Sequence, residues 1–412
     1  MSPMDIDNDV STLLASIRQE IESSELINIL YELEDFYERK LWHQLTLKLD
    51  EFYYGDYVEI TNDLKAKINN LFISQFSSKL NPIKVVDFCL ESFNGKPKET
   101  LDHLLDLKAQ FINSIKKENN IREDDDEELK NLVDNDESII YVDLQAARYY
   151  VLLADINKAE EILNKLNEKF DTNDTINNFD NPKLNAAFYL TKCELYKETE
   201  NYNSYYLNAL LYLSSVENNL KDNDKLELCY EICIAALLGD KIYNFGELIL
   251  HDILNVISEE SSSYFWLYNL IQNLNSGNIS EFDKWLAIAY KKSPFLVKFE
   301  VFLKQKIIIM SLLELISIKS TTNKHLSFQE ISGFTGTPVN DVEHLIIKCF
   351  SLDLIKGYIN QIDEVLVVTW LQPRILNLDQ VKVLHNHLIE WTSQLDKLSH
   401  EVHKNGGSIW AS

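Results

Sequence analysis

The sequence has 412 residues, of which 45% are apolar, so it has room for about three ordinary domains and a large core. Its formal net charge of −26 disfavours binding to nucleic acid or an anionic membrane, because affinity for phosphates rests mainly on Lys and Arg. Gly and Pro punctuate turns, so their low numbers, 10 and 7, favour long helices.

The cysteine pattern and the terminus indicate a soluble, intracellular protein. The five cysteines are scattered and form no C-x-x-C pair, which is typical of a reducing compartment. The acidic start "MSPMDIDNDVSTLL" lacks the apolar run of a signal peptide. Charged residues interrupt the apolar stretch 295–318 too often for a membrane span. We therefore expect a location in the cytoplasm and nucleus, without a membrane partner.

Residues 1–116 are predicted to form helical repeats. One apolar stripe at helical spacing consists of Leu26, Ile29, Leu30, Leu33, Phe36 and Tyr37. A second stripe begins at Leu45, after Trp42.

Residues 117–138 break this pattern with a run of acids from Glu123 to Glu128. Like charges at this density repel each other and leave little to bury, which predicts a solvated loop. A specific acidic recognition segment is the alternative.

Residues 139–321 are predicted to form a helical solenoid. Polar corners followed by an apolar residue recur at Asp155, Asn201, Lys241 and Asn278, with offsets of 46, 40 and 37 residues. A period near 40 residues is typical of stacked helix pairs. Gly239 is interpreted as the end of a helix rather than part of a phosphate-binding loop, because neither a preceding strand nor a Gly-Lys-Ser/Thr ending is present.

Residues 322–376 are predicted to form a winged helix. Ser327 and Glu330 make a capping box for its first helix, and Thr337 with Pro338 start a second. Two strands follow, Ile355–Gln361 and Val365–Trp370, joined by an acidic turn at Ile362–Glu364.

The hairpin of this winged helix is a candidate protein interface, because an exposed strand edge can pair with another chain. The candidate residues are Tyr358, Ile359, Val365, Leu366, Val367 and Val368. Packing within the chain is the alternative. DNA binding is disfavoured, because the second helix begins with Asp341 and Glu343 where a DNA reader needs cations.

Residues 377–403 are predicted to form a long helix with an apolar heptad seam, followed by a tail at 404–412. The seam consists of Val381, Leu384, Leu388, Trp391, Leu395, Leu398 and Val402. Burial against a partner is preferred over folding back onto the small winged helix, and Trp391 would be its main anchor.

No catalytic, cofactor or metal site is predicted. Cys229 and Cys233 share a helical face, but no third ligand completes a metal site, so buried thiols are the preferred interpretation. His385 and His387 point about 200° apart on a helix and cannot bind one ion together.

Several stretches resemble a known family, and they follow in the expected order over nearly the whole chain. They are "YERKLWHQL" (37–45), "LLDLKAQF" (104–111), "ALLGDKIYNFGEL" (236–248), "VEHLI" (342–346), "WLQPRI" (370–375) and the terminal "SIW". The solenoid and terminal winged helix resemble PCI-domain proteins, and these motifs resemble the ninth non-ATPase subunit family of the proteasome regulatory particle lid, in its yeast-type form.

This resemblance implies a mainly α fold: a TPR-like helical solenoid, a winged-helix (PCI) module and a long C-terminal bundling helix. It also implies a structural, non-enzymatic role. The implied partners are other PCI subunits of the lid, the lid deubiquitinase dimer and a ubiquitin receptor subunit. A subunit of another PCI complex, the signalosome or a translation initiation complex, and a winged-helix nucleic-acid adaptor remain the alternatives.

Overall fold

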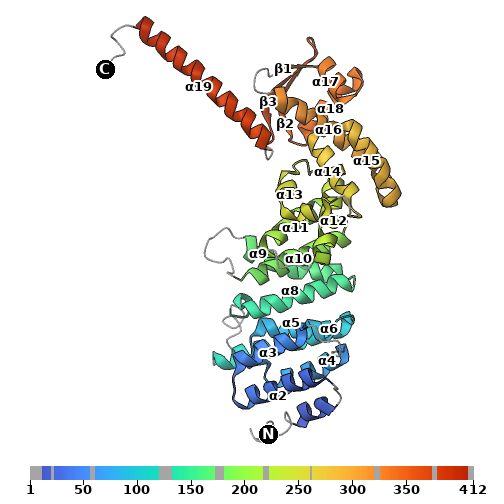
Figure 1. Cartoon of the computed structure of the whole chain (residues 1–412), viewed down its shortest axis with the longest axis vertical. Helices are drawn as coiled ribbons and strands as arrows, with labels where there is room; N and C mark the ends of the chain where they lie inside the picture. Colours follow the sequence, from blue (N-terminus) through green and yellow to red (C-terminus); the bar gives the residue numbers. More distant parts are fainter. Residues whose placement is uncertain are drawn as a thin grey trace. The chain divides into compact units, whose positions relative to one another are not determined.

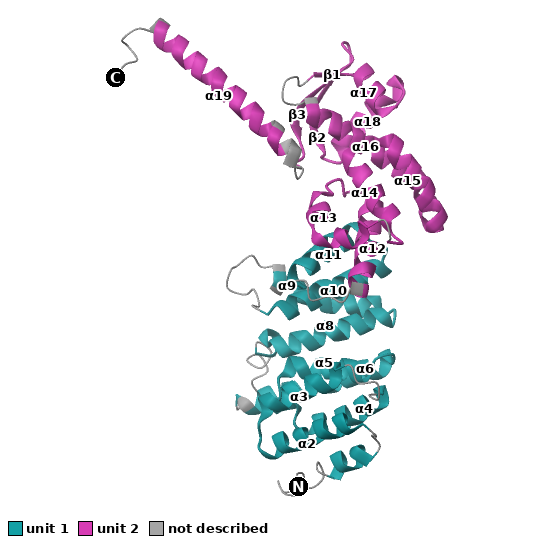
Figure 2. Ribbon diagram, viewed as in Figure 1, with its two compact units in different colours: residues 1–218 teal, residues 219–412 magenta. Residues whose placement is uncertain are grey.

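A computed structural model describes most of the chain. The described residues are 12–19, 23–55, 61–119, 132–171, 181–216, 222–259, 262–319, 325–373 and 378–406. The chain divides into two compact units, Met1–Asn218 and Asn219–Ser412, which are coloured separately in Figure 2. The finer division predicted from the sequence stays a prediction.

The first unit is a stack of helices (Figure 1). Its helices are α2 (Ser24–Glu38), α3 (Trp42–Tyr54), α4 (Asn62–Leu71), α5 (Pro82–Ser92), α6 (Pro97–Glu118), α8 (Glu137–Leu152), α9 (Ile156–Asp171), α10 (Pro182–Glu198) and α11 (Tyr202–Val216), with short 3-10 turns η1 (Ile73–Gln75) and η2 (Ser77–Lys79). Helices close in sequence pack on one another, and α8 contacts α5, α6, α9 and α10. The helical-solenoid prediction is confirmed for this unit.

Several helix pairs turn at the same kind of corner, where one residue has a left-handed backbone. These residues are Lys40, Ala154, Glu200 and Gly277, with φ of 58°, 62°, 53° and 67°. The next N–H then donates to the carbonyl oxygen five residues earlier: Leu41 to Phe36, Asp155 to Tyr150, Asn201 to Tyr196 and Asn278 to Asn273. This pattern is the Schellman helix ending, which satisfies terminal carbonyls. It confirms the predicted corners at Asp155, Asn201 and Asn278.

The predicted acidic loop is shorter than expected, and residues 120–131 at its centre lie outside the described residues. Helix α6 continues to Glu118, with Lys116 and Lys117 in its last turn, where cations are favourable. Asp136 is the N-cap of α8, and its carboxylate accepts hydrogen bonds from the N–H groups of Ser138 and Ile139. The flanking charges therefore terminate helices instead of extending a loop.

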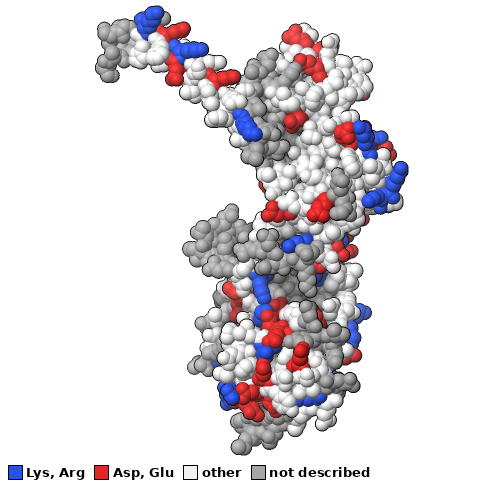
Figure 3. All heavy atoms as spheres, in the orientation of Figure 1, with Lys and Arg blue, Asp and Glu red and all other residues white. Residues whose placement is uncertain are grey.

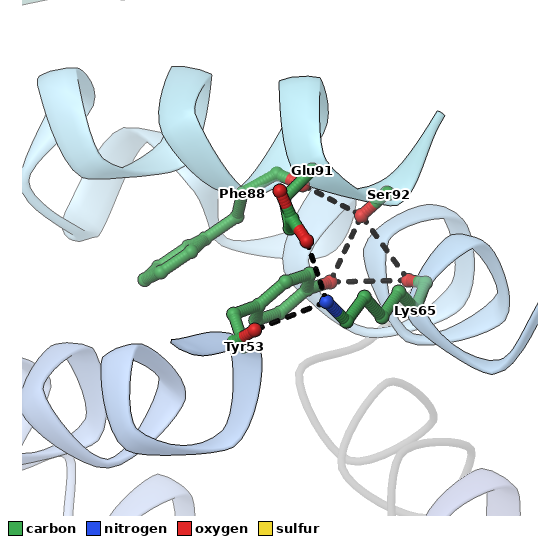
Figure 4. A network of polar contacts seen from close by, with 5 residues as sticks. All are labelled: Tyr53, Lys65, Phe88, Glu91 and Ser92. Carbon is green, nitrogen blue, oxygen red and sulfur yellow. Dashed lines mark hydrogen bonds and ion pairs between the residues drawn. The ribbon is translucent and has the colours of Figure 1, made fainter. Parts of the chain in front are cut away.

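The predicted stripe of α2 lies in the core, since Leu26, Ile29, Leu30 and Leu33 are all buried. One set of polar groups inside the first unit is paired across helices, in the network of α3, α4 and α5 in Figure 4. The ammonium of Lys65 donates to the Tyr53 carbonyl oxygen at 3.0 Å and to the Glu91 carboxylate at 2.7 Å. The Tyr53 hydroxyl donates to the Lys65 carbonyl oxygen at 3.0 Å. These bonds join three helices.

The second unit begins with a helical part. Its elements are α12 (Asp222–Leu238), α13 (Gly246–Leu250), η3 (Asp252–Ile257), α14 (Phe265–Ser276), α15 (Ile279–Lys292), η4 (Pro294–Phe299) and α16 (Glu300–Lys319). The predicted corner at Lys241 does not join two long helices. Residues 239–245 are not helical, and the five-residue helix α13 follows them. Ile242, Tyr243 and Phe245 are nevertheless buried, because the segment packs inside the unit.

The winged helix follows, with β1 (His325–Ser327), α17 (Phe328–Thr335), α18 (Val339–Ser351), β2 (Ile355–Asn360) and β3 (Val365–Leu371). The strands form an antiparallel sheet in the order β1-β3-β2. The strand β1 was not predicted, because three residues carry no alternating pattern. Ser327 caps α17 as predicted, accepting from the Glu330 N–H at 3.3 Å. Thr337 does not cap α18, which begins at Val339 with Pro338 before it.

Candidate protein-interaction surfaces

The terminal helix α19 (Leu378–Gly406) carries the predicted heptad seam, and all seven seam side chains are exposed. Their exposed fractions run from 44% at Leu384 to 62% at Trp391. An ordinary amphipathic helix buries such a stripe in its own domain. The winged helix of the same chain leaves this stripe open to solvent, and the role of the seam as an interface stays a prediction.

The structure separates the six wing candidates into two groups. Leu366, Val367 and Val368 on β3 are buried, whereas Tyr358 on β2 is 57% exposed, and Ile359 and Val365 are half-buried. Strand β3 lies between β1 and β2, so both of its edges are already paired. The prediction that β3 offers its edge to a partner is therefore wrong, because it assumed a two-stranded hairpin. Among the described strands, none covers the outer edge of β2.

A close backbone approach fixes Gly357 in β2. Its register with β3 shifts between Lys356 and Gly357, which marks a bulge. A Cβ atom at Gly357 would lie 2.1 Å from the Val367 carbonyl oxygen. Only glycine fits here, so Gly357 allows β2 and β3 to approach this closely.

The surface that reads DNA in a nucleic-acid-binding winged helix is acidic in this protein. Asp341 and Glu343 lie in the first half of α18, and Asp363 and Glu364 lie in the wing turn. Of the nearby cations, Lys356 lies over the ring of Trp370, with 5.1 Å between its Nζ and the ring centroid. Carboxylates at both positions repel a phosphate backbone, so the geometry argues against DNA binding.

The two residue pairs that were weighed as metal ligands differ in burial. Cys229 and Cys233 are fully buried in α12, and burial raises the pKa of the Cys233 thiol well above its ordinary value. His385 is exposed and His387 half-buried on α19. Within the described residues, no group of three or more His, Cys, Asp or Glu side chains could hold a metal ion. In the same residues, no helix has the length and apolar character needed to cross a membrane.

The hollows on the described surface include one in each unit. One, of about 610 Å³, lies between α6, α8 and α9, where the Lys108 ammonium contacts the Asp143 carboxylate at 2.5 Å. The other, of about 430 Å³, lies between α16 and α18 and is lined by Ile308, His344 and Lys348 among others. In the first hollow the charges of Lys108 and Asp143 neutralise each other.

The "GDKIYNF" stretch owes its shape to a residue that the sequence analysis missed, Lys306 on α16. Its ammonium donates to the carbonyl oxygens of Ala236, Leu237 and Gly239 at 2.8, 3.1 and 2.6 Å. The side chain is 1% exposed, and burial lowers its pKa to about 7, against the opposing effect of Asp240. Lys306 shares a helical face with Leu303, Ile307 and Met310, and this spacing could have placed it in the core.

These features define a helical-repeat protein that ends in a winged helix and an exposed apolar helix. The family profile described as PSD13 N-terminal repeats matches residues 29–271, and that of the PCI domain matches residues 286–370. The first match covers more than half of the chain, so the chain belongs to the PSD13 family of PCI-domain proteins.

Three relatives align with most of this chain. The "26S proteasome regulatory subunit RPN9" of Saccharomyces cerevisiae is 36% identical over 98% of this chain and 99% of its own length. The "26S proteasome non-ATPase regulatory subunit 13 homolog B" of Arabidopsis thaliana is 30% identical over 88% of this chain and 90% of its own length. The "Probable 26S proteasome regulatory subunit rpn9" of Schizosaccharomyces pombe is 29% identical over 92% of both chains.

Proposed function

We propose that this chain is a non-catalytic structural subunit of the lid of the 26S proteasome regulatory particle. In that role it supports ubiquitin-dependent protein degradation. The main support is the similarity to the yeast subunit over 98% of this chain and 99% of the relative. The aligned region includes both the N-terminal repeats and the PCI domain of this chain. The name of the Arabidopsis thaliana relative, "26S proteasome non-ATPase regulatory subunit 13 homolog B", supports a regulatory role without ATPase activity.

The seam of α19 is the proposed attachment to the helices of other subunits. Seven apolar side chains stay exposed on one stripe, and burying a large apolar side chain contributes about 1.5–3 kcal/mol. Trp391 is 62% exposed and is the largest of them, so it is the proposed anchor of the contact. Recognition would come from shape and apolar burial along the helix.

The outer edge of β2 is the proposed second attachment, to a neighbouring PCI subunit. Tyr358 and Ile359 lie on this strand, and a partner strand could use the backbone groups that face away from β3. A pairing of this kind gives orientation as well as affinity, because the register of the strands fixes one geometry.

The finer partners rest on the family resemblance. They are other PCI subunits of the lid, the lid deubiquitinase dimer and a ubiquitin receptor held near the solenoid. The proposed location is the cytoplasm and nucleus, where the assembled particle acts.

The identities of co-purifying chains test this function. The full chain would be tagged at its own locus, purified at low salt, and its partners identified by mass spectrometry. The proposal expects proteasome lid subunits in stoichiometric amounts. Recovery of signalosome or translation-initiation subunits in their place would overturn it and leave the PCI architecture intact.

A further inference from the structure

The face formed by α18 and the wing turn combines exposed apolar side chains with carboxylates. Ile362, in the turn between β2 and β3, is 94% exposed and is the most exposed large apolar side chain among the described residues. On α18, Ile347 is 50% exposed and Val339 is 38% exposed. Single exposed apolar residues are common, but several on one face mark an interaction surface.

The wing turn that presents Ile362 is held by hydrogen bonds. The Asn360 side-chain oxygen accepts from the N–H groups of Ile362 and Asp363 at 3.2 and 3.4 Å. Its amide nitrogen donates to the Asp363 carboxylate at 2.8 Å, and the Glu364 carbonyl oxygen accepts from the Phe328 N–H at 2.8 Å. Such a turn is ordered before a partner arrives, which lowers the entropic cost of binding.

A contact between the turn and α18 brings the apolar residues together. The Gln361 amide donates to the Glu343 carboxylate at 3.4 Å. Val339 and Ile347 lie four residues before and after Glu343, one helical turn on either side. Ile362 follows Gln361 directly, so the contact links the turn that carries Ile362 to the helix that carries Val339 and Ile347.

The charges on this face are carboxylates. They are Glu343, Asp363 and Glu364. None of the three forms an ion pair with Lys or Arg within the residues that the structure describes. Figure 3 shows Asp and Glu atoms gathered at the outer end of the winged helix. A partner that meets these carboxylates must bring positive charge, because like charges at an interface cost affinity.

We propose that the face of α18 and the wing turn docks a basic amphipathic helix of another protein. The apolar side of that helix would cover Ile347 and Ile362, and its Lys or Arg side chains would meet Glu343 and Asp363. This contact is separate from the α19 seam and from the β2 edge. It does not rest on the proposed role in the lid.

Peptide binding to the full chain tests this proposal. The probe is a fluorescent amphipathic helix of leucine and lysine, roughly 18 residues or five turns long. The expected result is saturable binding that Ile362→Asp and Ile347→Asp each weaken about tenfold, a typical hot-spot effect. The matched control is Val301→Asp, at a 70% exposed position on α16, which should leave binding unchanged. An isosteric pair, Asp363→Asn with Glu364→Gln, should weaken binding severalfold and reduce its salt dependence.

Two results would overturn the proposal. In the first, Ile362→Asp leaves the peptide affinity equal or higher. This would mean that attraction to the acidic chain alone drives binding, because the substitution adds a carboxylate. If the peptide binds the α19 seam, Leu388→Asp removes binding and Ile362→Asp does not. Ile362 is almost fully exposed, so its variant should keep the wild-type melting temperature, which separates a lost contact from a lost fold.

Discussion

The Lys306 ammonium lies 2.6 Å from the carbonyl oxygen of Gly239, and this contact joins α16 to the end of α12. The same ammonium lies 5.4 Å from the ring centroid of Phe245. The carbonyl groups at the end of a helix have no partner within that helix. Lys306 therefore satisfies the end of α12 and shapes the segment that follows it.

Replacing Lys306 with methionine should destabilise the second unit. The change keeps the length of the side chain but leaves the carbonyl oxygens of Ala236, Leu237 and Gly239 without this donor. The expected loss in the free energy of unfolding is about 1–3 kcal/mol, measured by urea denaturation. Lys304→Met is the control, because Lys304 is exposed and its ion pair with Glu300 lies at the surface. A Lys306→Met variant as stable as wild type would show that burying the charge costs as much as its bonds contribute.

The stability of the wild type should rise with pH relative to Lys306→Met. The pKa of Lys306 is lowered to about 7 in the folded state from 10.5. Between these values the unfolded chain holds the proton that the folded chain has released, so the free energy of unfolding increases with pH. The difference between the two proteins should grow from pH 7 to about pH 9.5 in chemical denaturation. A difference that is constant over this range would contradict the buried, proton-releasing lysine.

Gly277→Ala should destabilise the chain more than Gly336→Ala. Both glycines are left-handed, with φ of 67° and 68°. An added Cβ at Gly277 would lie 2.9 Å from the Cα of Ser311, whereas at Gly336 it meets open space. Gly336→Ala should cost about 1–2 kcal/mol from backbone strain alone. Gly277→Ala should cost the same strain plus about 1–3 kcal/mol from overpacking. The two losses in the free energy of unfolding are measured from the urea midpoints of the variants. Equal costs at both sites would mean that α16 does not approach the corner this closely.

Gly357→Ala should disturb the winged helix without affecting the first unit. The added Cβ would lie 2.1 Å from the Val367 carbonyl oxygen, so strands β2 and β3 must separate locally. Faster amide exchange in residues 355–371 is expected, with the exchange of residues 24–118 unchanged. Unchanged exchange in both segments would contradict the observed strand register.

Periodic features could be predicted from the sequence, and long-range contacts could not. The stripe from Leu26 to Leu33 and the Ser327 cap depend on residues a few positions apart, and both were predicted correctly. The central position of β3 depends on the three-residue strand β1, which is paired through the register of His325 with Val367. Such a strand has no local signature, so the edge of β3 was misassigned.

The seam of α19 shows how far a candidate site can be predicted. The heptad spacing places Leu388 and Trp391 on one stripe, and both side chains are exposed in the structure. The acidic residues near the start of α18, Asp341 and Glu343, were also visible in the sequence. The proximity of the wing turn to this helix was not, because the Gln361 contact with Glu343 joins residues 18 positions apart.

Incorporation of an α19 variant into the lid tests the central claim most directly. Leu388→Asp with Trp391→Ala removes the middle of the seam, and Asn386→Asp with Ser393→Asp adds charge to other exposed positions of the same helix. Each tagged full-length chain would be expressed in place of the wild type, and the co-purifying lid subunits quantified by mass spectrometry. The account predicts that the seam variant is a folded monomer that recovers less than about a tenth of the lid subunits, and that the control recovers them fully. Recovery of the lid with the seam variant at the wild-type yield would contradict it.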